Sequence, residues 1–310
     1  MARLYEESKA VLFEKAKAVK NPSEFSFVVM GDSWAGDGET SNAILTEAFR
    51  EARKHHPLFI LHSGDSVFTG TVEQFQTGRD YKTASPVEKV HHVKSFRQLV
   101  DQYLLRPDPN KVGKEKIPIF VVPGNHEENG FNGPFDNFVK LIGPTNFMLN
   151  IPRLKLSLIG MKNVFRTQQN GMVTTKYGFT KGELELLRKY LRQRQKYTFL
   201  GMHTPPHAGK WSNPNYFTEA ESTFKIGLQS FLNTIKGKVS KVFVGHVHAY
   251  DRAIIQDIEY ILSGGTGAPL VKLGFLSSKS KVAKEAFHIV VITVKDGKIS
   301  QRFIPIGWTA

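Results

Sequence analysis

A chain of 310 residues with 40% hydrophobic and 23% charged residues has the composition of a globular protein with a substantial core, and we expect a single domain over residues 1–310. The absence of cysteine excludes disulfides and thiolate metal sites, so any bound metal must have nitrogen and oxygen ligands. A formal net charge of +14 favours anionic partners, but without a block of like charge we expect a scattered basic surface rather than a nucleic-acid-binding arm.

The first 22 residues predict a helical extension that ends near Asn21-Pro22. Its inward-facing positions recur at helical spacing: Leu4, Ser8, Val11, Leu12 and Val19. Its mixed charges and missing apolar segment are unlike a signal peptide, and no run in the chain approaches the ~20 apolar residues of a membrane span. We therefore expect no membrane span and a cytoplasmic location, or export if a leader precedes this sequence.

The first third of the chain alternates between buried strands and helices. Strands are expected over 25–30, 57–61 and 117–122, helices over 41–54 and 87–105, and an irregular excursion over 69–86. Each strand ends at a glycine next to a polar residue, as at Gly31-Asp32 and Gly64-Asp65. This alternation predicts an α/β fold with a parallel or mixed sheet covered by helices.

The remainder of the chain continues this pattern and then becomes rich in strands. Thr180 and Glu183 form a capping box that opens a helix, and Asp296-Gly297 predicts a hairpin turn. A helix is also expected over 224–235, and strands over 154–159, 198–202, 241–244, 254–255, 260–262, 287–294 and 299–304.

Metal-ligand side chains follow the expected strands at the points where these strands end. They are Asp32, Asp65, Asn125, His126, His203, His246 and His248. Strand ends of open α/β sheets form ligand crevices, and carboxylates with imidazoles suit Mn, Fe, Zn or similar ions. A carboxylate can bridge two cations, and cations about 3.5–4 Å apart clamp the attacking and leaving oxygens of a phosphoryl transfer.

The His246-Val247-His248 pair leaves two interpretations open. An extended backbone would point both imidazoles the same way, whereas a bent loop would offer them to neighbouring metals. Taken alone, such a pair is equally well an exposed strand end.

Five motifs together resemble the calcineurin-like metallophosphoesterase superfamily over about residues 24–305. They are Gly31-Asp32, Gly64-Asp65, Gly124-Asn125-His126-Glu127, Gly201-Met202-His203 and Gly245-His246-Val247-His248. The stretches 246–252 and 263–268 are most similar to the purple acid phosphatase-like branch. The resemblance implies a four-layer α/β/β/α sandwich of two mixed β-sheets flanked by helices.

The resemblance also implies roles at matching positions. Asp65 matches a carboxylate that bridges two divalent ions, with Asp32 and His248 as ligands of the first ion. Asn125, His203 and His246 match ligands of the second ion, and His126 matches a catalytic histidine that assists the leaving group or holds a phosphoryl oxygen. A metal-bound hydroxide would attack phosphorus directly, without a phospho-enzyme.

Two positions depart from the superfamily pattern. Trp34 stands where many members have a histidine ligand, and Phe68 stands where the purple branch has a tyrosine ligand. Neither side chain binds a metal, so we expect a weaker first site without the purple Fe(III) chromophore. Asp37 is a candidate substitute ligand, although a solvated loop acid is the stronger interpretation on ordinary loop composition.

Several other residues have weaker signals. His207 either touches substrate or is a surface histidine, the second being slightly favoured, and His62 is expected to be packed in its strand. Aromatic and amide residues of the 205–219 loop either wall a pocket or form a surface loop: Trp211, Asn213, Asn215 and Tyr216. A basic group either steers an anionic substrate or is solvated: Lys272, Lys279, Lys281 and Lys284.

We therefore predict a metallophosphoesterase that uses two divalent ions, drawn from Mn, Fe, Zn or Ni, on a small anionic phosphoester. Phosphomonoesters are the expected substrates, with diesters or nucleotides as further candidates. One rival is a non-enzymatic scaffold on the same fold, suggested by Trp34 and Phe68. The other is a basic nuclease, for which nucleic acid would be the partner.

Overall fold

Two mixed β-sheets form the centre of the protein. The computed structural model describes residues 3–82, 90–110, 112–128, 134–169, 172–207, 226–274 and 280–307. The first sheet has the strand order β16-β15-β1-β2-β5, in which β1, β2 and β5 are parallel. Its strands are β1 (Glu24–Met30), β2 (Ile60–His62), β5 (Ile119–Val121), β15 (His288–Lys295) and β16 (Lys298–Pro305).

The second sheet has the order β14-β12-β13-β11-β10-β7-β6, with a parallel centre formed by β7, β10, β11 and β13. Its outer strands β6, β12 and β14 pair antiparallel with their neighbours. The strands are β6 (Phe147–Ile151), β7 (Leu156–Gly160), β10 (Tyr197–Gly201), β11 (Lys241–Val244), β12 (Tyr250–Ile255), β13 (Ile258–Ser263) and β14 (Ser280–Lys284). The predicted α/β class with two mixed sheets is thus confirmed.

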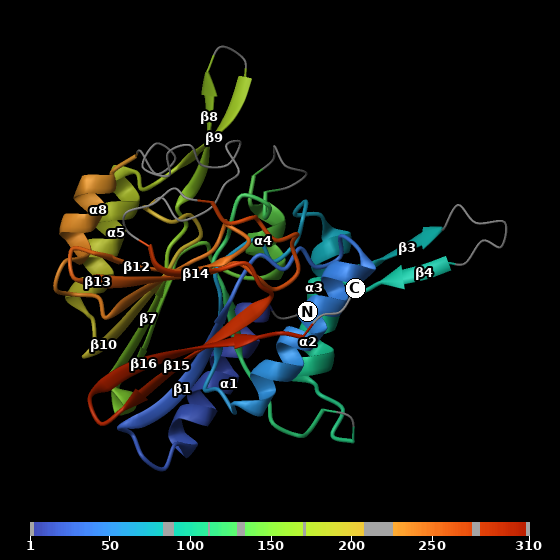
Figure 1. Ribbon diagram of the computed structural model, residues 1–310, viewed down its shortest axis with the longest axis horizontal. Coiled ribbons are helices and arrows are strands. Elements are labelled where there is room, and N and C mark those ends of the chain that lie inside the picture. Colours follow the sequence, from blue (N-terminus) through green and yellow to red (C-terminus); the bar gives the residue numbers. More distant parts are fainter. Residues whose placement is uncertain are drawn as a thin grey trace.

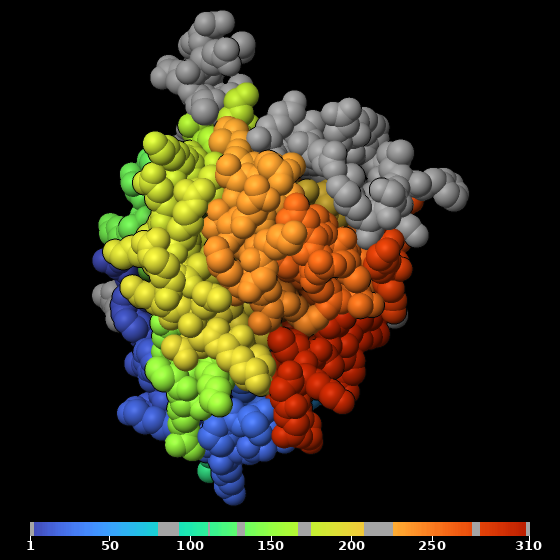
Figure 2. Space-filling view, turned by 90° about the vertical axis from the view of Figure 1, so that its left-hand side faces the viewer, coloured from blue at the N-terminus to red at the C-terminus, as the bar shows by residue number. Residues whose placement is uncertain are grey.

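Helices cover the outer faces of both sheets (Figure 1). On the side of the first sheet lie α2 (Glu39–Lys54), α3 (Phe96–Val100) with the π-helix η2 (Asp101–Leu105), and α4 (Asp136–Leu141), while α1 (Leu4–Ala18) packs at the edge of the sandwich against β5 and β6. On the side of the second sheet lie α5 (Lys181–Arg192) and α8 (Leu228–Ile235). These two helices form much of the yellow and orange face in Figure 2. The predicted four-layer arrangement is therefore observed.

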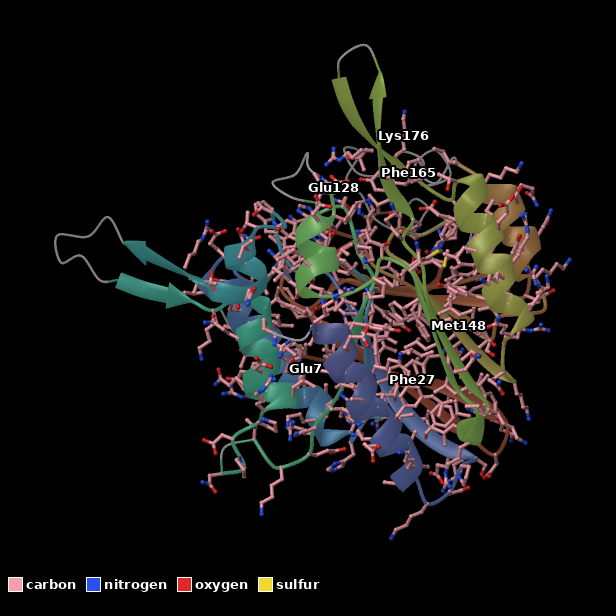
Figure 3. The ribbon with its side chains drawn as sticks, turned by 180° about the vertical axis from the view of Figure 1, so that it is seen from behind. Glu7, Phe27, Glu128, Met148, Phe165 and Lys176 are labelled. Carbon is pink, nitrogen blue, oxygen red and sulfur yellow. The ribbon has the colours of Figure 1, made fainter. Side chains whose placement is uncertain are left out.

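The alternation of side chains along each strand divides the core into three clusters. In β1, Phe27 and Val29 point into the space between the sheets, where Phe27 packs against Phe59 and Phe199 from the two sheets (Figure 3). Val28 and Met30 point the opposite way, toward α2 and α3. A third cluster lies between the second sheet, α5 and α8. Strands buried on both faces explain the continuous apolar runs of the sequence.

Two β-ribbons project from this sandwich (Figure 1). One pairs β3 (Arg79–Lys82) with β4 (Val90–Val93), and the other pairs β8 (Val164–Gln169) with β9 (Met172–Tyr177). The shorter helices η1 (Glu73–Thr77) and η4 (Pro152–Leu154) complete the regular elements of the described residues.

The predicted helix over residues 87–105 is wrong in its first part. Residues 90–93 form strand β4, and helix α3 begins after Ser95, whose side chain forms a capping box with Gln98. The short Val90–Val93 segment pairs with β3, a partner that helical periodicity does not reveal. Five further strands of the described residues were not predicted: β3, which lies in the expected irregular excursion over 69–86, and β6, β8, β9 and β14. Trp211, Asn213, Asn215, Tyr216 and Lys279 lie outside the described residues.

An ionic cluster connects the N-terminal helix α1 to α3 and η2. Both carboxylate oxygens of Glu7 lie 2.8 Å from Nη2 of Arg97, and one lies 2.7 Å from Nη2 of Arg106. Asp101 contacts both arginines from the opposite side. Because the Arg97 side chain is 7% exposed, its charge depends on these carboxylates. Within the described residues, no helix combines the length and apolarity that crossing a membrane requires.

We expect Glu7→Gln to lower the free energy of unfolding at pH 7 by about 1–2 kcal/mol, because it removes charged hydrogen bonds to a buried guanidinium. Burial raises the pKa of Glu7, but Arg97 and Arg106 outweigh this effect and bring it below the ordinary 4.5. The stabilisation is therefore present above pH 4.5 and is lost as the pH falls through the lower folded-state pKa.

Urea unfolding at pH 7 and pH 3 measures this difference between wild type and variant. The control is Glu14→Gln on the same helix, whose partner Lys17 is 73% exposed and which should change stability by less than about 0.5 kcal/mol. Equal losses in the two variants, or a loss that does not shrink at pH 3, would contradict the assigned role of Glu7.

Candidate metal centre

The ends of parallel strands from both sheets meet at one edge of the sandwich. Asp32 follows β1 and Asp65 follows β2 in the first sheet, while His203 follows β10 and His246 follows β11 in the second. The backbone N–H of His246 donates to both carboxylate oxygens of Asp32, at 2.9 and 3.0 Å. The structure therefore brings side chains together that are more than 200 residues apart in sequence.

One group of potential metal ligands consists of Asp65, His203 and His246, all buried. Nε2 of His203 lies 3.1 Å from Nδ1 of His246, 3.3 Å from Oδ2 of Asp65 and 3.1 Å from Oδ1 of Asn125. Ligand atoms bound to one cation at about 2.1 Å are separated by roughly 3.0–3.4 Å. The four atoms thus have the spacing of a coordination shell, and all four residues were predicted to share an ion.

A second group consists of Asp32, Asp65 and His248, whose ligand atoms lie within 4.8 Å of one another. Nε2 of His248 is 3.7 Å from Oδ1 of Asp32. Asp65 belongs to both groups, which is the position that a bridging carboxylate occupies. His246 and His248 fall in different groups, so the bent-loop interpretation of this pair fits the structure.

Hydrogen bonds behind the imidazoles fix which nitrogen each presents to the centre. Nδ1 of His203 is 2.9 Å from the carbonyl of Ser63, and Nδ1 of His248 is 2.7 Å from the carbonyl of Pro269. A carbonyl can only accept, so Nδ1 must donate and Nε2 of a neutral ring keeps its lone pair for a metal.

The backbone at three of these residues is left-handed. Asp32, Asp65 and His246 have φ values of 57°, 53° and 72°, a conformation that non-glycine residues rarely adopt. Glycines are required next to these residues because a Cβ there would clash with neighbouring atoms. A Cβ at Gly64 would lie 2.5 Å from Nδ1 of His203, and one at Gly124 would lie 2.1 Å from Oδ1 of Asp65. The glycine before each ligand in the sequence motifs therefore has a steric cause.

Charges in the cluster are strongly coupled. Burial raises the pKa of Asp32, whereas His203 outweighs burial and holds the pKa of Asp65 well below its usual range. Burial opposes a charge on His203, but Asp65 and Asp32 raise its pKa to about 9. Burial lowers the pKa of His248 to about 4. Asp65 thus stays ionised and burial keeps His246 and His248 neutral, so a carboxylate and imidazole lone pairs are available to a cation, which would displace the proton of His203, and the residues fit a metal site.

His126 lies at the rim of the centre. Its Nδ1 is 2.6 Å from the carbonyl of Phe68, and its Nε2 is 3.8 Å from Oδ2 of Asp65. Its backbone N–H donates to Oδ1 of Asp65 at 3.0 Å. The ring is 15% exposed, unlike the buried rings of His203 and His248. This position differs from that of the ligand groups and suits contact with a substrate.

Glu127 has a role that the sequence did not predict. Its buried carboxylate accepts hydrogen bonds from the backbone N–H of Asp65 at 2.8 Å, of Ser66 at 2.5 Å and of Gly124 at 2.5 Å. It thereby joins the loop after β2 to the loop after β5. In the sequence, this role was indicated by the position of Glu127 directly after His126 in the motif.

The positions that depart from the superfamily pattern hold an aromatic cluster. The ring of Trp34 lies 4.6 Å from Phe68, 5.0 Å from His126 and 4.9 Å from His248. The ligand groups found among the described residues do not include Asp37, whose pKa is raised by burial. On the opposite side, Tyr177 of the β8–β9 ribbon lies 5.0 Å from the ring of His246, a contact that the sequence did not predict.

Two further histidines belong to neither ligand group found among the described residues. His62 is packed as predicted: burial lowers its pKa to about 3, and its Nε2 is 3.0 Å from Oγ of Ser33. The preference for His207 as a surface histidine is wrong. His207 is fully buried, with Nε2 3.9 Å from Oδ2 of Asp251, a partner on β12 that only the fold brings near.

Comparisons with known proteins agree with this geometry. The sequence pattern of the calcineurin-like phosphoesterase family matches residues 25–250. Curated proteins give no match. Among solved structures the fold is similar to GAP50, the anchor in the inner membrane complex of Plasmodium, with 13% identity, a TM-score of 0.59 and coverage of 91% of this chain and 85% of that chain.

Two phosphatases also have a similar fold. Purple acid phosphatase PPD1 from yellow lupin (Lupinus luteus) seeds has 16% identity and a TM-score of 0.60, over 91% of this chain and 52% of that chain. A dimetal phosphatase from Danio rerio has 12% identity and a TM-score of 0.54, over 93% of this chain and the whole of that chain. At these identities the likeness establishes the fold alone.

We expect Asp65→Asn to abolish binding of both cations, because Asp65 belongs to both ligand groups, whereas His246→Ala should mainly weaken one group. Inductively coupled plasma mass spectrometry after Mn loading should show a fall from about two ions per chain to near zero for Asp65→Asn. Asp37→Asn is the control and should keep the wild-type metal content. Loss of metal in that control would instead make Asp37 a ligand.

Proposed function

Because the chain belongs to the calcineurin-like phosphoesterase family, we propose that it is a phosphoester hydrolase that uses two divalent cations. The observation that carries this proposal is the presence of Asp65 in two buried ligand groups. One group is Asp65 with Asn125, His203 and His246, and the other is Asp32 with Asp65 and His248. An arrangement that shares one carboxylate suits a pair of ions better than a single ion.

The donor atoms limit the choice of metal. The ligands are carboxylate, amide and imidazole groups, a set that suits Mn, Fe, Zn or Ni. When bound, such a cation pair lowers the pKa of bound water and neutralises charge on a phosphoryl group. The protein supplies the orientation: Ser63 and Pro269 fix the ring tautomers of His203 and His248, and Glu127 fixes the backbone at Asp65.

We assign His126 the task of handling the proton of the leaving group. Because Nδ1 donates to the Phe68 carbonyl, Nε2 is the nitrogen that faces Asp65 and the centre. In the imidazolium form this Nε2–H can donate to the oxygen of the leaving group. The partial exposure of the ring allows contact with a substrate that arrives from solvent.

Small phosphomonoesters are the substrates that we favour. The net charge of +14 raises the local concentration of any anionic substrate. The sequence has no block of like charge that would track a nucleic acid backbone. A diester or nucleotide substrate would have the same phosphoryl chemistry, so direct comparison of a monoester with a diester is required.

A non-enzymatic scaffold is the second candidate, and Trp34 and Phe68 favour it. They occupy positions where ligands are expected, and neither side chain coordinates metals. A structure of similar fold is described as the anchor in the inner membrane complex of Plasmodium, at 13% identity.

Metal stripping and reloading tests the proposed function. Protein reloaded with Mn, Fe, Zn or Ni is assayed on aryl phosphomonoester and diester, beside its metal stoichiometry. Two ions per chain with faster monoester hydrolysis support the proposal. One ion or none, without turnover under any loading, supports the scaffold. Diester cleavage that outpaces the monoester, with salt-dependent retention on DNA, supports a nuclease.

We expect His126→Ala to keep the wild-type metal content and to lower kcat by about 10²–10⁴-fold, the usual contribution of a general acid. Steady-state kinetics on an aryl phosphate, with metal analysis of the same sample, measures both effects. His62→Gln changes a buried histidine outside both ligand groups and is the control. Turnover by His126→Ala at the wild-type rate would remove His126 from the mechanism.

A further inference from the structure

Trp34 has a backbone conformation that a bulky residue seldom adopts. Its φ is 47°, and its N–H donates to the carbonyl of Asp65 at 3.2 Å. Left-handed geometry at a tryptophan is an outlier, and such outliers cluster at functional sites. Trp34 stands two residues after the candidate ligand Asp32, and its ring lies beside His248 of the second ligand group.

The indole ring lies against the residues that would meet a substrate. It contacts the imidazole of His248 edge-on at 4.9 Å and that of His126 at 5.0 Å, and Phe68 lies behind it at 4.6 Å. His248 belongs to the second ligand group, and His126 has been assigned to the leaving group. The ring therefore bridges one predicted metal ligand and the proposed acid.

The indole nitrogen of Trp34 indicates which kind of ligand the ring can bind. Nε1 of Trp34 is buried, and no acceptor lies within hydrogen-bonding distance among the described residues. A buried N–H without an acceptor is costly, and such exceptions call for an explanation in each structure. Indole N–H is a donor only, so this atom cannot bind a cation. It can bind an anion.

We propose that Trp34 is an anion-positioning residue, whose indole N–H donates a hydrogen bond to an oxygen of the phosphoryl group in the metal centre. The inference rests on the proposed function, since it assumes that a tetrahedral oxyanion enters this centre. A donor aimed at a charged oxygen is strengthened by its low-dielectric surroundings. Compared with the superfamily pattern, position 34 thus lacks a metal ligand and instead supplies a hydrogen-bond donor to the substrate.

Nuclear magnetic resonance of Zn-loaded, ¹⁵N-labelled protein tests the contact without measuring activity. The chain has three tryptophans, and Trp211→Phe and Trp308→Phe assign the Trp34 signal by elimination even if a Trp34 variant fails to fold. Addition of inorganic phosphate, and separately of orthovanadate, should move the Trp34 indole N–H signal downfield and leave the other two signals nearly unmoved.

Trp34→Phe keeps an aromatic ring and removes the donor. By calorimetry, we expect phosphate to bind this variant about tenfold more weakly, the effect of one hydrogen bond to a charged group. The zinc content should stay at the wild-type value, because no ligand is removed. Phe68→Leu is the control, since it alters the same aromatic cluster without removing a donor, and its phosphate affinity should stay within about twofold.

The outcomes separate the two proposals. If wild type binds zinc and phosphate but the Trp34 signal does not move, or Trp34→Phe binds phosphate as tightly as wild type, the role of Trp34 is wrong and the proposed function stands. If wild type binds neither zinc nor phosphate, both proposals are overturned. A fall in zinc content in Trp34→Phe would also overturn the inference, because Trp34 would then support the metal site instead.

Discussion

The arrangement of the candidate metal ligands depends on the buried carboxylate of Glu127. Four backbone N–H groups, from Asp65, Ser66, Val67 and Gly124, donate to it, so it holds the loops after β2 and β5 in one arrangement. Burial and the neighbouring Asp65 raise the pKa of Glu127, whereas the Gly124 N–H and the Ser66 hydroxyl oppose that rise. Because Asp65 belongs to both ligand groups, a shift of its backbone would disturb both at once. The positions of the candidate ligands thus depend on a residue that belongs to neither ligand group.

The packing of the two sheets stabilises the strained backbone at the candidate ligands. Left-handed backbone at Asp32, Asp65 and His246 is unfavourable locally, and it persists only where the surroundings leave no alternative. Each of these residues follows a strand buried on both faces, and the N–H of His246 donates to Asp32 across the sheets. Packing of Phe27 against Phe59 and Phe199 fixes the distance between the sheets, and with it the distance between the ligands that they carry.

Local sequence patterns predicted the features that depend on local causes. Buried strands appear as apolar runs, and their ends appear as Gly-Asp or Gly-Asn because the ligand side chain packs on the glycine, as at Gly64 and Gly124. The order of these ends gave the candidate ligands that the fold brings together. Features that depend on distant partners were missed or wrong: β4 pairs with β3, His207 is buried beside Asp251, and Tyr177 reaches His246 from a ribbon. No pattern within a few residues contains that information.

The fold alone does not decide between an enzyme and a scaffold, because structures of similar fold at 12–16% identity include two phosphatases and an anchor. The chemistry of the centre favours a bound cation. The ligand atoms of Asp65, His203 and His246 lie close together inside the protein, where apolar side chains of similar volume would avoid the cost of desolvation. A cation would satisfy the carboxylate and the imidazole lone pairs together, once it displaces the proton of His203. Trp34 fits the same view, since its ring lies beside His248 and its buried N–H lacks a protein acceptor among the described residues.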